Sequence, residues 1–269
     1  MAAVPDLPQP VVDATTRWLA RHDELAPGLI DGLYVVGSAA LGDWRPGSDI
    51  DLIAFTSREV DADESPLLRS AHGAAATDDP GVDVDGPRLE WADVAVAPRR
   101  LVRPWSIGDE FHHDDGCFEL HPVTWRTLAR HGVEVRGPAV AELEVFDDDR
   151  AVRDFVRDNT NSYWRGVSDQ IEQALAASPD RHQFDASTVS WCVLGIARML
   201  ITARTGDVVS KTEAGRRAVD QFPTDRALVA RAIDIRHGRS TDPADRPTMD
   251  DTVRFIRQVA DEVEATLCA

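Results

Sequence analysis

The stretch from residue 32 to residue 55 constrains the fold of this chain more than any other. It holds two short apolar runs, residues 32–36 and 50–55, and both read as buried β-strands. Between them, residues 39–41 fit one helical turn, which is followed by a Pro-Gly-Ser turn. This order of strand, helical turn, tight turn and strand predicts an α/β unit with both strands in its core.

Two aspartates, Asp49 and Asp51, stand one residue apart at the start of the second run. Residues i and i+2 of a strand share a face, so the two carboxylates can hold a cation together. The pair Gly37 and Ser38 opens the helical turn, where free backbone N–H groups favour an anion and glycine lets the main chain come close. The segment therefore predicts a site for a polyphosphate and magnesium.

Each of these elements alone has a plainer explanation. A Gly-Ser pair is common in turns, and an Asp-x-Asp pattern at a strand edge often only faces water. In combination they are harder to dismiss, because two like charges beside a core strand are costly unless a cation or a hydrogen bond compensates them. The ordered set favours a functional site.

Length and charge narrow the class of protein. A chain of 269 residues suits one large domain or two small ones. Its net charge of −18 argues against a nucleic-acid partner and favours a cationic substrate, although acidity also aids solubility. We expect no apolar run long enough to cross a membrane, a cytoplasmic location and a monomer.

A third acidic residue follows later in the N-terminal half. Residues 88–98 read as a strand that ends at Pro98, and Asp93 would share a face with Ala95 and Ala97. If this strand pairs beside the first two aspartates, Asp93 completes a cluster of metal ligand and general base. The alternative is an edge-strand aspartate that faces water.

The chain after residue 150 follows a helical period. The segment 187–204 is apolar nearly all round, which predicts the central helix of a bundle. The other expected helices cover residues 150–177, 212–222, 225–236 and 248–267.

Two basic residues of this half are candidates for binding phosphate. Arg198 lies inside the central helix, where a structural salt bridge is the common explanation and a grip on a polyphosphate is the functional one. Lys211 is the only lysine among 29 basic residues. A compact ammonium suits a triphosphate, but the chance survival of one surface lysine explains it equally well.

The combination of Gly37-Ser38, Asp49-Ile-Asp51 and Asp93 resembles the polymerase-beta-like nucleotidyltransferase superfamily. More narrowly, the chain is similar to the AadA-type aminoglycoside adenylyltransferases, which modify streptomycin and spectinomycin. The narrower resemblance rests on short runs spread over most of the chain: Pro104-Trp105, Arg136 to Glu142, Gly195 to Arg198, Thr205-Gly206, Ser210-Lys211 and Gln221 to Pro223.

The resemblance implies an enzyme of two domains. Residues 1–149 would form an α/β (α+β) nucleotidyltransferase domain with a short mixed sheet, and residues 150–269 an all-α helical bundle domain. Such an enzyme transfers AMP from ATP to a hydroxyl of a small acceptor and releases pyrophosphate, with two Mg²⁺ ions. The acceptor would be an aminoglycoside or aminocyclitol.

The resemblance also assigns roles. Asp49 and Asp51 would hold magnesium, and Asp93 would serve as base and metal ligand. The phosphates would be bound from both domains, by Gly37, Ser38, Ser48, Arg198 and Lys211.

Some positions depart from the family pattern. The family base is often a glutamate, one methylene longer than Asp93. Before the central helix, where the family places a tryptophan and acidic residues against the aminoglycoside, this chain offers Phe184 and Asp185. Two other readings stay open: a nucleotidyltransferase that modifies a protein or another macromolecule, and a non-catalytic nucleotide-binding regulator.

Overall fold

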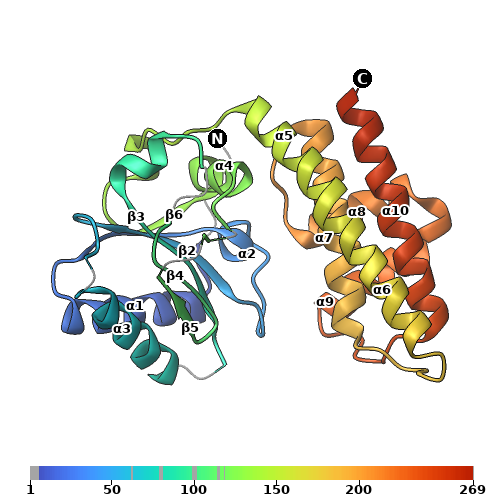
Figure 1. The fold of residues 1–269 in the computed structure, drawn as a ribbon, viewed down its shortest axis with the longest axis horizontal. Helices are drawn as coiled ribbons and strands as arrows, with labels where there is room; N and C mark the ends of the chain where they lie inside the picture. Colours follow the sequence, from blue (N-terminus) through green and yellow to red (C-terminus); the bar gives the residue numbers. More distant parts are fainter. Residues whose placement is uncertain are drawn as a thin grey trace. The chain divides into compact units, whose positions relative to one another are not determined.

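The computed structural model describes residues 6–61, 63–78, 81–98, 102–113, 116–117 and 119–268. The chain divides into two compact units, Met1–Asp148 and Asp149–Ala269 (Figure 1). The first unit combines a sheet with helices, and the second is helical. The predicted fold class, a mixed α/β unit followed by a helical bundle, is confirmed.

A sheet of six strands in the order β5-β4-β3-β2-β1-β6 organises the first unit. The central strands β2 and β3 are parallel, and every other pairing is antiparallel. The strands are β1 (Ile30–Val35), β2 (Ile50–Thr56), β3 (Val84–Glu90), β4 (Trp105–Ile107), β5 (Glu110–His112) and β6 (Val133–Arg136). β1 and β2 therefore form the two expected strands around the Gly-Ser turn.

Helices cover both faces of this sheet (Figure 1). α1 (Gln9–Leu25) and α3 (Ser65–Asp78) pack together and share a buried core with Leu33, Leu52 and other residues of one face. The opposite face packs against α4 (Pro122–His131) and the 3₁₀ turn η1 (Trp91–Ala95). Alternate residues of β2 thus enter different cores, as the two-residue period of a strand requires.

A buried polar group lies within the first core. The Arg88 guanidinium, on β3, is almost completely buried between the rings of Trp18 and Phe111, 5.3 and 5.2 Å from their centroids. One of its nitrogens lies 3.4 Å from Nδ1 of His72, a side chain that is 1% exposed. Burial, followed by the charge of Arg88, lowers the pKa of His72 to about 4.

The free energy of unfolding should fall when the pH drops from about 6.5 to 4. The pKa of His72 is about 4 in the folded chain against an ordinary 6.5, so in this window only the unfolded chain binds the proton. This difference amounts to about 3 kcal/mol for His72. Urea denaturation at pH 7 and pH 4.5 measures it, with His72→Gln as the control that should show a weaker dependence. Equal dependence in both proteins would contradict this assignment.

The second unit is a bundle around one buried helix. α7 (Ala186–Thr205) packs against α8 (Lys211–Gln221), α9 (Arg226–Arg236) and α10 (Arg246–Cys268). The expected long helix before it is interrupted. It consists of α5 (Asp149–Asn159), a π-helical turn η3 (Thr160–Trp164) and α6 (Arg165–Ala177).

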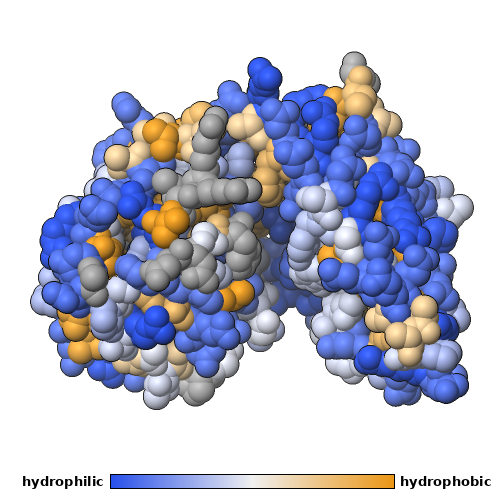
Figure 2. All heavy atoms as spheres, viewed as in Figure 1, coloured by the Kyte–Doolittle hydropathy of each residue, from blue (hydrophilic) through white to orange (hydrophobic). Residues whose placement is uncertain are grey.

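α7 corrects the expectation that the chain lacks an apolar run of membrane-spanning length. Within the part of the chain that the structure describes, this is the one helix long and apolar enough to cross a bilayer. About 72% of its apolar window is buried, as in the core helix of a bundle. The face of the helical unit that Figure 2 shows is mostly hydrophilic. Two of its large apolar side chains, Tyr163 and Trp191, are nevertheless exposed.

Glycine at position 195 lets α7 pack against η3. A Cβ atom at Gly195 would lie 2.4 Å from Cη2 of Trp164, closer than atoms can approach. Gly195→Ala should therefore lower the free energy of unfolding by about 1–3 kcal/mol through overpacking. Gly166→Ala is the matched control, because nothing lies within 4 Å of a Cβ there and alanine favours a helix by about 0.5–1 kcal/mol. Urea denaturation of both variants measures the difference, and equal losses would rule out the packing explanation.

Candidate active site

The Gly-Ser turn and the second aspartate lie in direct contact. β1 runs through Val36 into the four-residue helix α2 (Gly37–Ala40), and Gly37 adopts a φ of +60°. The Ser38 N–H lies 3.4 Å from Oδ2 of Asp51 on the neighbouring strand. A Cβ at Gly37 would lie only 1.7 Å from the same oxygen, so glycine is what permits this approach.

The Ser38 hydroxyl has no hydrogen-bond partner in the described part of the chain, although its oxygen is buried. A buried hydroxyl without a partner costs roughly 1–3 kcal/mol. An oxygen-rich ligand beside Asp51, such as a phosphate, would supply the missing hydrogen bond. Ser48 is half-buried and precedes Asp49, an exposed residue just before β2.

Asp85 supplies the third carboxylate of this region. β2 and β3 are parallel, and Asp85 is in register with Asp51. The Gly108 N–H donates a 2.7 Å hydrogen bond to Oδ1 of Asp85. Burial raises the pKa of this carboxyl to about 6, with further contributions from the charges of Asp49 and Asp83 and an opposing one from the Gly108 N–H.

The expectation that Asp93 lies on a strand was wrong. β3 ends at Glu90, and residues 91–95 form η1, because the Trp91 ring stacks on Phe55 at 4.3 Å and turns the chain. Asp93 accepts hydrogen bonds from the Glu90 N–H at 2.9 Å and from two nitrogens of Arg103 at 2.8 and 2.9 Å. Its contacts cap η1 and neutralise an arginine, while Asp85 occupies the position beside Asp51.

Glu119 is a further acidic residue near this group. The pKa of its carboxyl is raised well above the usual range, first by burial and then by the charges of Asp51, Asp85 and Asp49. No motif of the sequence pointed to Glu119, which lies outside the helices and strands, between β5 and α4. In the folded chain, Glu119 lies close enough to the three aspartates for their charges to raise the pKa of its carboxyl.

The donor set suits magnesium bound together with phosphate. Over the described ranges, no three His, Cys, Asp or Glu side chains by themselves form a group that could hold a metal ion. Magnesium is usually bound by one or two carboxylates plus substrate phosphates and waters, so an all-protein cage is not required. Asp49 and Asp51 could provide those carboxylates, and the partnerless Ser38 hydroxyl, next to the backbone N–H that faces Asp51, could bind a phosphate oxygen.

In the helical unit, the structure gives local contacts for the predicted residues. Lys211 is the first residue of α8, whose cap is the Ser210 hydroxyl bonded to Glu213 N–H at 3.1 Å. Arg198 is half-buried in α7. Their contact with a nucleotide stays a prediction.

Phe184 and Asp185 also make structural contacts. The Phe184 backbone pairs with Ala244, and Oδ1 of Asp185 caps α7 by accepting the Ser187 N–H at 2.9 Å. This hydrogen bond lowers the pKa of the Asp185 carboxyl. Asp185 is nevertheless exposed and Phe184 half-buried, so both keep surface for a ligand. Their role in acceptor binding stays a prediction.

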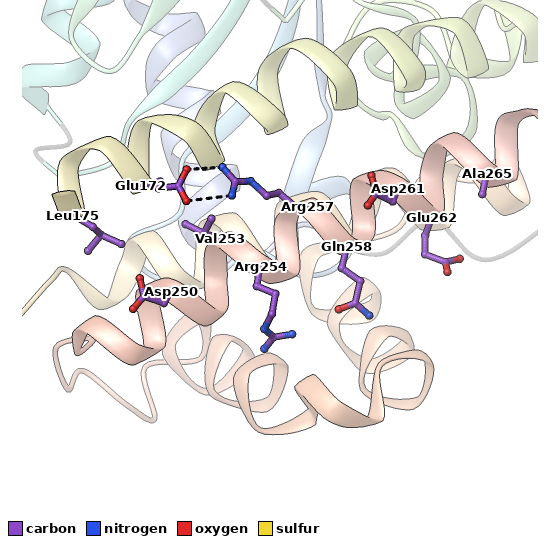
Figure 3. Close-up of a pocket in the computed structure, with 10 residues that line it drawn as sticks. All are labelled: Glu172, Leu175, Asp250, Val253, Arg254, Arg257, Gln258, Asp261, Glu262 and Ala265. Atoms are coloured by element: carbon purple, nitrogen blue, oxygen red, sulfur yellow. Dashed lines mark hydrogen bonds and ion pairs between the residues drawn. The ribbon is translucent and has the colours of Figure 1, made fainter.

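A hollow of about 740 Å³ lies on the helical unit between α6 and α10 (Figure 3). Its charged side chains are largely paired already. Arg257 binds Asp169 and Glu172 at 2.8 and 2.9 Å, and Arg254 binds Asp225 at 2.7 Å. A charged ligand would have to compete with these ion pairs, so we do not assign the active site to this hollow.

Comparison with known proteins finds a matching family for each half of the chain. The family described as "Nucleotidyltransferase domain" matches residues 21–85, and "Aminoglycoside adenylyltransferase, C-terminal domain" matches residues 155–262. Together these matches cover more than half of the chain. It belongs to the AadA-type nucleotidyltransferases. The nucleotidyltransferase match ends at residue 85, so the three aspartates at positions 49, 51 and 85 lie inside it.

The fold of this AadA-type nucleotidyltransferase is shared with a solved enzyme. The structure is similar to spectinomycin adenyltransferase AAD(9) from Enterococcus faecialis, solved with ATP and spectinomycin, with a TM-score of 0.66 and 14% sequence identity. The similarity covers 94% of this chain and 98% of that one. No curated protein matches the sequence significantly.

Proposed function

We propose that this AadA-type nucleotidyltransferase transfers AMP from ATP to a hydroxyl of a small cationic acceptor, an aminoglycoside or aminocyclitol such as streptomycin or spectinomycin. The observation that carries the proposal is the buried Asp85 carboxylate in register with Asp51, beside the partnerless Ser38 hydroxyl. The family match to an aminoglycoside adenylyltransferase domain and the shared fold of AAD(9) support the acceptor class.

Different residues of the first unit would bind the magnesium and the phosphates. Asp49 and Asp51 would hold magnesium, which neutralises phosphate charge and stabilises the attacking and leaving oxygens when bound. The Ser38 hydroxyl would donate a hydrogen bond to a phosphate oxygen, and Gly37 keeps the backbone clear of Asp51. Ser48, Arg198 and Lys211 are the further candidates for binding the triphosphate.

Asp85 is the candidate general base. The Gly108 N–H binds its Oδ1, and no described residue donates a hydrogen bond to Oδ2, which leaves that oxygen for the acceptor hydroxyl. As the hydroxyl oxygen bonds to the α-phosphorus, pyrophosphate leaves and the proton passes to Asp85. A pKa of about 6 keeps this carboxyl mostly ionised at neutral pH while making it a stronger base than an exposed aspartate.

Charge supports a cationic acceptor. The chain has a net charge of −18, and Asp49, Asp51 and Asp85 lie in the region of the candidate site. An acceptor that carries ammonium or guanidinium groups would offset this charge as it binds. Phe184 and Asp185 are the candidate acceptor contacts on the helical unit.

The acceptor assignment is tested by pyrophosphate release. Purified protein is mixed with ATP, Mg²⁺ and single compounds from a panel of streptomycin, spectinomycin and related aminocyclitols. We expect release that depends on at least one acceptor and on Mg²⁺. If no compound supports release, the acceptor class is wrong, and transfer of labelled ATP onto lysate protein then tests modification of a macromolecule.

A further inference from the structure

The turn between β4 and β5 is held by two buried side chains. Its residue Gly108 has a φ of +56°. The Gly108 N–H donates to Oδ1 of Asp85 at 2.7 Å, and the Gly108 carbonyl oxygen lies 2.9 Å from Nε2 of His72 on α3. The one backbone segment thus joins the candidate base to a histidine that lies in the core.

The two partners of His72 determine which of its nitrogens carries the proton. A carbonyl oxygen only accepts hydrogen bonds, so Nε2 must be the donor toward Gly108. The Arg88 guanidinium only donates, so Nδ1, 3.4 Å away, must be the bare acceptor. The lowered pKa of His72 agrees with this neutral ring.

Arg88 ties the histidine to the backbone on both sides of Asp85. One of its nitrogens donates to the Gly86 carbonyl at 2.9 Å and to the Ser106 hydroxyl at 2.7 Å. That hydroxyl lies 3.2 Å from the Val84 carbonyl. Arg88, Ser106 and His72 are each 1% exposed. Buried hydrogen bonds therefore hold the carbonyl groups of Val84 and Gly86, on either side of Asp85, as well as Oδ1 of Asp85 itself.

We propose that His72 is a positioning residue for Asp85. By donating to the Gly108 carbonyl, it holds the turn so that the Gly108 N–H binds Oδ1, and this leaves Oδ2 directed at the reacting hydroxyl. His72 touches neither substrate nor magnesium and acts only through the turn. The inference rests on the proposed function, in which Asp85 is the base.

Two kinds of replacement separate positioning from packing. Gln places an N–H donor near the position of Nε2, whereas Phe and Leu fill the space without a donor. His72→Phe should lower kcat about 10- to 100-fold with little change in KM for ATP. His72→Gln should restore kcat close to the wild-type value. His72→Leu serves as the second donor-free variant if the Phe variant does not fold.

Hydrogen exchange at the Gly108 amide gives a readout that does not depend on activity. In ¹⁵N-glycine-labelled protein, this amide should exchange slowly in the wild type and in His72→Gln. It should exchange at least about tenfold faster in the donor-free variants, as it should when Asp85→Asn weakens its acceptor. Unchanged exchange and unchanged kcat in a folded donor-free variant would overturn the inference, as would a Gln variant that loses as much kcat as the Phe variant.

Together, the kinetics and the hydrogen exchange distinguish failure of this inference from failure of the proposed function. If the wild-type protein releases no pyrophosphate with any acceptor, the proposed function fails. The exchange of the Gly108 amide then still decides whether His72 controls the donor to Asp85.

Discussion

Asp85→Asn should lower kcat for acceptor-dependent pyrophosphate release by about 10²- to 10⁴-fold, the usual contribution of a general base. Asparagine keeps the shape of the side chain and an oxygen for the Gly108 N–H, but it cannot take a proton from the acceptor hydroxyl. KM for ATP should change far less than kcat. Steady-state kinetics with the best acceptor of the panel measures both constants.

Asp93→Asn is the matched control, because it is the same substitution at an aspartate just after the C-terminal end of β3. Asp93 accepts from Arg103 and caps η1, so its loss should lower the free energy of unfolding by about 1–3 kcal/mol. Turnover of the folded Asp93→Asn protein should remain near the wild-type rate. If Asp93→Asn loses turnover and Asp85→Asn keeps it, the base is Asp93 and our assignment is wrong.

Gly37→Ala should abolish most of the turnover by displacing Asp51. The added Cβ would lie 1.7 Å from Oδ2 of Asp51, so this carboxylate must move away from its position beside Ser38. A shift of about 1 Å at a catalytic group can lower the rate about 10²-fold. Kinetics of the folded variant, at saturating ATP and Mg²⁺, measure this loss.

Gly47→Ala controls for backbone strain, because Gly47 lies in the same connection between β1 and β2 as Gly37. Gly47 also has a positive φ, +84°, but no atom lies within 4 Å of a Cβ built there. Both variants should therefore lose about 1 kcal/mol or more of unfolding free energy, because alanine disfavours a positive φ. Only Gly37→Ala should lose turnover beyond what its unfolded fraction explains. Equal losses of turnover in the two variants would show that strain alone is responsible.

The helices and the first two strands could be predicted because their signals are local. Apolar residues recur with a helical period after residue 150, and α7 begins and ends within one residue of the predicted 187–204. The π-helical turn η3 could not be foreseen, because the apolar period passes through it without a break. The role of Gly195 likewise depends on Trp164, a residue of another helix.

The third strand was misplaced toward the C-terminus. Residues 82–85 carry the alternating Val-Asp-Val-Asp pattern of a half-buried strand, although the glycines on either side, Gly81 and Gly86, are also typical of a loop. The structure begins β3 at Val84, while the stacking of Trp91 on Phe55 ends the strand before Asp93. The alternating pattern was the signal that could have found Asp85.

The sequence alone determined that Asp49 and Asp51 lie two residues apart at the start of a core strand, a spacing that lets two extended residues face the same way. In the structure, Asp51 lies in β2 and Asp49 lies just before it. The third carboxylate comes from another strand, and its identity depends on the register between β2 and β3. Only the tertiary structure shows that this residue is Asp85, which pairs with Asp51. Register is set by hydrogen bonds and packing between segments that lie far apart in the sequence, so no local pattern around Asp51 or Asp85 could show that the two residues pair.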